Sequence, residues 1–81
     1  MVDKSLSFGQ QNFLFIKADE TGLVYDYVGY MTHKGSILIA RFPKDGMSAK
    51  YYLGAGDFDT IFAAKGTKTY DYPNTLVDPN V

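Results

Sequence analysis

The sequence predicts a mainly β protein, built as an antiparallel meander of four to six strands with one short helix over about residues 57–65. Runs rich in β-branched and aromatic residues recur between clusters of turn-forming residues, which is typical of strands joined by hairpins. Only one segment repeats its apolar residues at helical spacing. A chain of 81 residues has room for one domain, whose sheet either stays open or curls into an open barrel.

The strand-like runs are separated by turn chemistry that supports the meander. Strands are expected over residues 13–16, 23–31, 36–42, 47–53 and, as a final edge strand, 67–72. Turns are expected at 19–22, 32–35 and 44–46. Asp45 followed by Gly46 is the clearest hairpin signal, and it suits either a type I′ turn or a slightly longer loop.

The run 23–31 carries apolar groups on both of its faces. Alternation places Leu23, Tyr25, Tyr27 and Met31 on one face, with Val24, Asp26, Val28 and Tyr30 on the other. The strand is therefore expected to be covered on both sides, with Asp26 at an exposed part of its face. Gly29 indicates a bulge or a close approach of the backbone to another element.

The helix prediction depends on a stripe of apolar residues and on capping residues at both ends of the segment. Phe58, Ile61 and Phe62 stand at i, i+3 and i+4, and Asp57 is placed as an N-cap. Lys65 falls in the expected last turn, and Gly66 follows as a C-cap. Such a short helix is unstable alone in water, so its stripe is expected to pack on the sheet.

The two ends differ from the middle of the chain. Residues 1–12 are mostly polar and are interpreted as an N-terminal arm, and 13–72 as a single domain. Residues 73–81 contain two prolines and are interpreted as an extended tail. No apolar run approaches the roughly 20 residues that cross a bilayer, and no signal peptide is recognised, so no membrane partner is expected.

Composition argues against several classes of function. The net charge is −1 and Arg41 is the only arginine, whereas nucleic-acid affinity comes largely from phosphate neutralisation. No cysteine is present for disulfides or thiolate metal sites. The sole histidine, His33, lies in a predicted turn, and Asp57 and Asp59 suit the helix start.

The segment 54–56, Gly-Ala-Gly, leads into the helix but lacks the residues of a phosphate-binding loop. We therefore expect no catalytic, cofactor-binding or metal-binding residue and a non-enzymatic protein.

Tyrosine is the most unusual component. Tyrosine is favoured at interfaces because one end of its side chain is apolar and the other polar. We predict a protein-contact surface formed by Tyr25, Tyr27, Tyr30, Tyr51, Tyr52, Tyr70 and Tyr72. Stacking on single-stranded nucleic acid also uses aromatic strands, but it needs a cationic groove. The basic residues appear scattered over turns and strands: Lys17, Lys34, Lys44, Lys50 and Lys68.

Three short stretches together resemble a known group of proteins. They are residues 27–30 (Tyr-Val-Gly-Tyr), 56–62 (Gly-Asp-Phe-Asp-Thr-Ile-Phe) and 67–70 (Thr-Lys-Thr-Tyr). Their order is similar to that in small β proteins encoded among the structural genes of tailed bacteriophages.

The resemblance implies a virion component made in the host cytoplasm: a decoration, adaptor or tail-associated protein that contacts other virion proteins or further copies of itself. The alternative is a small β-barrel that binds a ligand or single-stranded nucleic acid.

Overall fold

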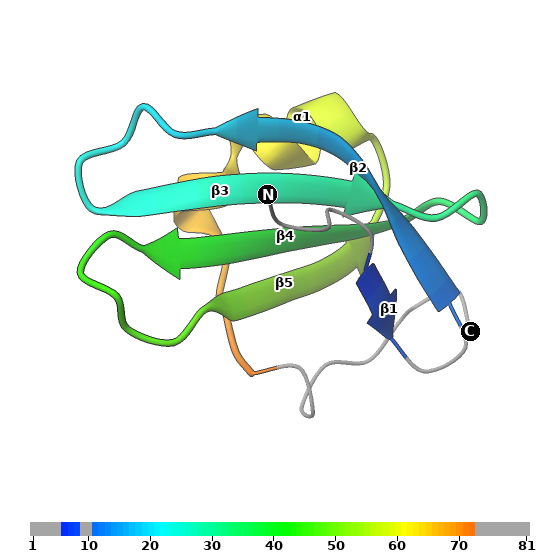
Figure 1. The fold of residues 1–81 in the computed structure, drawn as a ribbon. Coiled ribbons are helices and arrows are strands. Elements are labelled where there is room, and N and C mark those ends of the chain that lie inside the picture. Colours follow the sequence, from blue (N-terminus) through cyan, green and yellow to red (C-terminus); the bar gives the residue numbers. More distant parts are fainter. Residues whose placement is uncertain (1–5, 9–10, 73–81) are drawn as a thin grey trace.

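The protein is an open antiparallel sheet with one helical layer (Figure 1). The computed structural model describes residues 6–8 and 11–72, and their side chains from residue 13 onward. The strands are β1 (Leu6–Phe8), β2 (Gln11–Asp19), β3 (Tyr25–Met31), β4 (Ser36–Pro43) and β5 (Lys50–Ala55), paired in chain order. Helix α1 (Phe58–Ala63) and the 3-10 helix η1 (Lys65–Thr67) follow. The predicted fold class is confirmed, as an open sheet.

The first strand of the sheet begins earlier in the sequence than predicted. The range 1–12 was predicted to be an arm, but it contains β1 and the first residues of β2. These two strands pair antiparallel from Leu6 opposite Phe13 to Phe8 opposite Gln11. Leu6 and Phe8 are isolated apolar points in a polar stretch, which is too little signal for a three-residue strand. The predicted tail, 73–81, lies outside the described residues.

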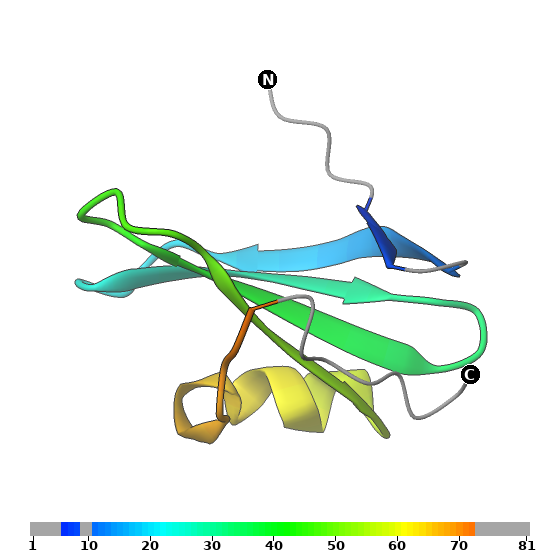
Figure 2. The same cartoon turned by 90° about the horizontal axis from the view of Figure 1, so that it is seen from below.

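Both faces of the sheet carry a core, as the pattern of β3 predicts. Helix α1 lies against one face (Figure 2), where Ile37 and Ile39 of β4 pack with Phe58 and Phe62. The buried residues on the other face are Phe13, Tyr30, Leu38 and Ala40. Successive residues of β4 therefore enter different cores, which explains its nearly continuous apolar sequence.

Gly29 is the point where the helix meets the sheet most closely. A Cβ atom built on Gly29 would lie 2.5 Å from Cζ of Phe58 and 2.9 Å from Cδ1 of Phe62. The predicted close approach is thus confirmed at this glycine. The bulge lies on the neighbouring strand, between Phe15 and Lys17 of β2.

Helix α1 begins as predicted and ends early. Asp57 is the N-cap, and its carboxylate accepts a hydrogen bond from the Thr60 backbone N–H at 2.9 Å. The rings of Phe58 and Phe62 are buried and stacked, with centroids 5.4 Å apart. The predicted C-cap at Gly66 is wrong: Ala64 ends the helix, and Lys65 and Gly66 belong to η1.

The predicted strand over 67–72 is also wrong, because only Asp71 pairs with the sheet. Its backbone exchanges two hydrogen bonds with Tyr51, of 2.7 and 2.9 Å. Tyr70 turns inward instead, and its buried hydroxyl donates to the Lys65 carbonyl at 2.7 Å. The segment therefore makes one isolated bridge to β5, at Asp71.

Two smaller predictions also need correction near the β4–β5 hairpin. Strand β5 begins at Lys50 because the loop is the longer of the two expected forms, with Asp45 accepting a hydrogen bond from the Met47 N–H at 3.0 Å. Asp26 is half-buried rather than exposed, and its carboxylate lies 3.3 Å from the Lys44 ammonium.

Candidate functional site

The structure divides the seven predicted contact tyrosines into three groups. Tyr30 and Tyr70 are buried, and Tyr72 is 47% exposed. The half-buried ones are Tyr25, Tyr27, Tyr51 and Tyr52. Most of the tyrosine surface is therefore used in packing, and the tyrosines that reach the surface near a cavity are Tyr25 and Tyr72.

Arg41 organises the tyrosines on the helix-bearing face. Its guanidinium carbon lies 4.4 Å from the ring centroid of Tyr25 and 4.6 Å from that of Tyr70. Alternation along β4 sends this arginine to the same face as Ile37 and Ile39, which explains why a charged group lies among rings. Its Nε atom is buried and has no hydrogen-bond partner in the described part of the chain. Contact with aromatic faces stabilises such a cation in place of water.

A second cation stands directly across from Arg41. Lys50 of β5 is its partner in the β4–β5 register, so both side chains project from the same face. Like charges in this relation repel each other. Among the residues that the structure describes, neither has a carboxylate within ion-pairing distance. The Lys50 ammonium instead lies 5.2 Å from the ring centroid of Tyr72.

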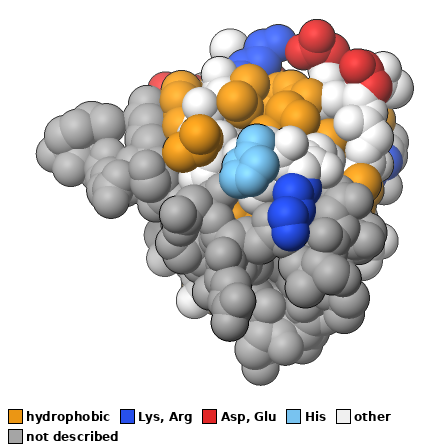
Figure 3. All heavy atoms as spheres, turned by 90° about the vertical axis from the view of Figure 1, so that its right-hand side faces the viewer, with side chains coloured by type: hydrophobic (Ala, Val, Ile, Leu, Met, Phe, Trp, Pro, Cys, Tyr) orange, Lys and Arg blue, Asp and Glu red, His pale blue; other side chains and the backbone are white. Residues whose placement is uncertain are grey.

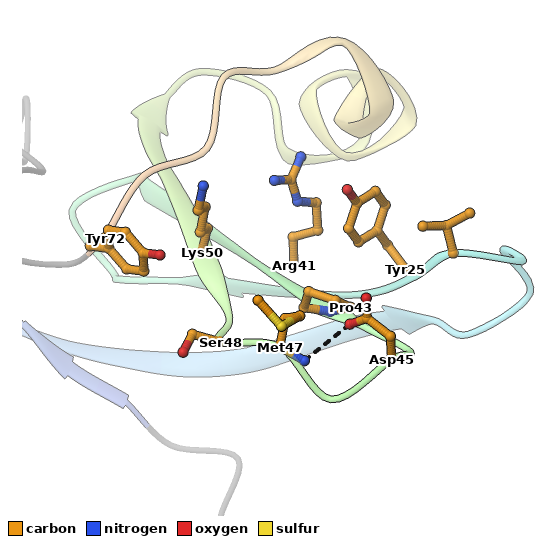
Figure 4. A pocket seen from close by; sticks show the side chains of 9 residues that line it. Tyr25, Arg41, Pro43, Asp45, Met47, Ser48, Lys50 and Tyr72 are labelled. Atoms are coloured by element: carbon orange, nitrogen blue, oxygen red, sulfur yellow. Dashed lines mark hydrogen bonds between the residues drawn. The ribbon is translucent and has the colours of Figure 1, made fainter.

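These residues line a pocket of about 260 Å³ at the end of the sheet. Figure 4 shows Tyr72, Lys50, Arg41 and Tyr25 in a row, each cation beside a ring, with Met47 below this row. The other lining residues are Val24, Pro43, Asp45 and Ser48. The rim is apolar and open to solvent, since Val24 is 61% exposed and Met47 is 70% exposed. We call this the Arg41 pocket.

The remaining cations of this face also lie over rings. Lys65 lies 4.7 Å from the Phe62 ring centroid, Lys17 lies 5.7 Å from the same ring, and Lys68 lies 5.2 Å from that of Tyr52. Lys17, Lys50 and Lys68 thus come from different segments, as predicted, and each lies over a different aromatic ring. The alternation of the strands already indicated which cations share a face. Their contacts with the rings also depend on residues 64–70, which fold back over that face.

Two ionisable groups in this layer, Asp19 and Tyr70, have pKa values shifted from the ordinary ones. Hydrogen bonds from Thr21 and Lys65 hold the pKa of Asp19 well below its usual range, and the Lys65 ammonium lies 2.9 Å from that carboxylate. Burial, together with the neighbouring Tyr27, raises the pKa of Tyr70, so its hydroxyl stays neutral as a donor. The cationic character of the pocket therefore comes from Arg41 and Lys50.

His33 lies at the opposite end of the sheet, in the turn between β3 and β4. It is exposed, and Figure 3 shows it beside apolar side chains, with acidic ones at the far rim of that face. Within the described part of the chain, no three metal-ligating side chains gather. No helix among those residues has the length and apolar character to span a membrane.

Comparison with known proteins identifies no relative of this chain. The chain matches no protein-family model, and neither a curated protein nor a solved structure matches it.

Proposed function

We propose that the protein is a non-enzymatic interaction module that works through protein–protein contacts, with the Arg41 pocket and its rim as the contact surface. One observation carries the proposal: an arginine packed against tyrosine rings lines the same pocket as the exposed apolar side chains of Val24 and Met47. Tyrosine, arginine and methionine are the residue types enriched where protein surfaces meet. Tyrosine and arginine also dominate the residues that carry most of the binding energy.

The resemblance to small phage structural proteins supplies the biological setting. We propose a virion component, as a decoration, adaptor or tail-associated protein. Its partners would be other virion proteins or further copies of this chain. The small size supports this role, because a domain of this length gains stability from a bound partner.

The decisive experiment measures assembly with and without a charge on the rim. Light scattering of the purified protein, alone and mixed with the products of neighbouring genes, reports oligomers and complexes. Met47→Asp places a carboxylate in the rim and should abolish the complex. Leu14→Asp is the matched control, since Leu14 is also exposed but pairs with Met31 at the far end of β3. A protein that stays monomeric and binds none of these partners contradicts the proposal.

A second candidate is a site for single-stranded nucleic acid, supported by the pairing of Lys50 with Tyr72 and of Lys68 with Tyr52. Cations beside rings suit bases that stack and phosphates that need neutralising. The net charge of −1 favours the protein partner over this one. Titration with a single-stranded oligonucleotide at two salt concentrations separates the two, because phosphate contacts weaken steeply as salt rises.

A further inference from the structure

We propose that the Arg41 pocket binds a carboxylate, and specifically the C-terminal residue of a partner polypeptide that ends in an apolar side chain. The choice of a polypeptide rests on the proposed function, whereas carboxylate binding does not.

The pocket carries two positive charges that have no ion-pair partner among the residues that the structure describes. Arg41 and Lys50 face each other across β4 and β5, which costs stability unless an anion lies between or beside them. Among the described residues that line the pocket, the acidic one is Asp45, whose carboxylate accepts a hydrogen bond from the Met47 N–H in the loop. The summed charge of these three groups is about +1, which matches a single carboxylate better than a doubly charged phosphate.

The geometry of Arg41 favours a planar anion. A guanidinium presents its donors in a rigid fork that fits both oxygens of one carboxylate. Contacts with the rings of Tyr25 and Tyr70 hold the plane of this fork, so less side-chain entropy is lost on binding. The buried Nε has no acceptor among the described residues, and a carboxylate bound at the guanidinium would supply one.

The volume of the pocket and the apolar side chains at its rim indicate what the ligand carries besides the carboxylate. A volume of about 260 Å³ is below the roughly 300–1,000 Å³ of pockets for drug-sized molecules, so it admits about one amino-acid residue. Val24, Met47 and Tyr72 surround the mouth with apolar surface. Because the charge and the apolar surface lie within one residue's reach, the ligand must carry both on one residue. The C-terminal residue of a polypeptide does so when its side chain is apolar.

The test uses the fact that Arg41 is the only arginine, so its Nε–H gives one unambiguous nuclear magnetic resonance signal. The protein is titrated with N-acetyl-leucine, with N-acetyl-leucinamide and with N-acetylglycine. We expect a saturable shift of the Nε–H signal with N-acetyl-leucine, weaker binding of N-acetylglycine and no saturable shift with the amide. An amide that binds as well as the acid, or an acid that gives no saturable shift, overturns the inference.

Two variants test the second cation. Lys50→Gln should weaken the binding of N-acetyl-leucine about two- to fivefold, the range for one partly exposed ion pair. Lys34→Gln removes the same charge from the exposed β3–β4 turn and should leave the affinity unchanged. Equal losses in both variants would show a general effect of charge and overturn the inference.

The outcomes also separate this inference from the proposed function. Binding of N-acetyl-leucine without any protein complex contradicts the function alone. A complex that survives Lys50→Gln, from a protein that ignores N-acetyl-leucine, contradicts the carboxylate site alone.

Discussion

Gly29 lies where β3 supports both aromatic rings of α1, and no larger residue fits there. An added methyl group would lie 2.5 Å from Phe58 and 2.9 Å from Phe62, closer than Cβ atoms come to other heavy atoms in folded proteins. Both rings belong to the buried cluster, so neither can move aside without opening space elsewhere. The missing side chain therefore sets the distance between helix and sheet.

Gly29→Ala is expected to destabilise the protein by about 1–3 kcal/mol, the usual cost of overfilling a packed core. Chemical denaturation with circular dichroism measures the free energy of unfolding. Gly66→Ala is the matched control, because no atom lies within 4 Å of its added Cβ. Equal stability of Gly29→Ala and the wild type would show that the helix does not pack here.

Tyr70 gives the folded protein a sensitivity to alkali. Burial raises the pKa of Tyr70 above the 10.0 of a free tyrosine, so the unfolded chain loses this proton at lower pH than the folded one. The resulting stability is present below pH 10 and falls as the pH rises above it. Tyr70→Phe should reduce this loss, measured as the difference in melting temperature between pH 8 and pH 11. An unchanged difference would place the alkaline sensitivity at other tyrosines.

At the scale of elements, α1 depends on its contact with the sheet. The helix has six residues, far fewer than a helix needs to persist alone in water. Asp57 caps its first turn, and the pKa of this carboxyl is lowered by the hydrogen bonds from Thr60. The apolar stripe then provides the larger part of its stability, through the stacked rings of Phe58 and Phe62.

Phe58→Ala and Phe62→Ala should each cost about 3–5 kcal/mol, the loss expected for a buried aromatic side chain. Urea unfolding curves give these values. Ala63→Ser changes the exposed end of the same helix and should stay within about 0.5 kcal/mol of the wild type. Near-neutral effects at both phenylalanines would mean that their rings form a binding surface rather than a core.

The sequence predicted the central elements and missed the ones that depend on tertiary contacts. Strands β3 and β4 and the start of α1 follow from alternation and capping, which are local properties. Gly66 resembled a C-cap, yet the chain continued into η1. The segment 67–72 alternates as a strand would, but burial of Tyr70 took precedence.

For the candidate site, the sequence predicts which strand faces carry the cations, but it does not predict the register that brings them together. Arg41 shares a face with Ile37 and Ile39 in the alternation, and Lys50 follows across the hairpin from the Asp45-Gly46 turn. The register that places the two cations opposite each other depends on loop length, which the turn signal left open.

At the scale of the whole molecule, β4 lies between two cores. Leu38 and Ile39 are neighbours in sequence, both are 0% exposed, and they belong to different clusters. A sheet with one solvent-facing side would leave one of them exposed. The protein therefore buries apolar area on both sides of a single strand, which partly offsets its small size.

Leu38→Ala and Ile39→Ala should each cost about 2–5 kcal/mol, because each leaves a cavity in one core. The double variant should be unfolded at 25 °C, since domains of this kind have about 5–15 kcal/mol of stability in total. Thermal unfolding followed by circular dichroism distinguishes the cases. A neutral effect at either position would mean that one face of β4 is open to solvent.

The order of the strands has a consequence for how fast the chain folds. Each strand pairs with its neighbour in sequence, so the four strand pairings form from short loops. Longer loops are closed when α1 packs on β3, when Asp71 joins Tyr51 and when Lys65 pairs with Asp19. Proteins dominated by local pairings fold faster than β sandwiches, so we expect a folding time on the order of milliseconds, with the helical layer completed last.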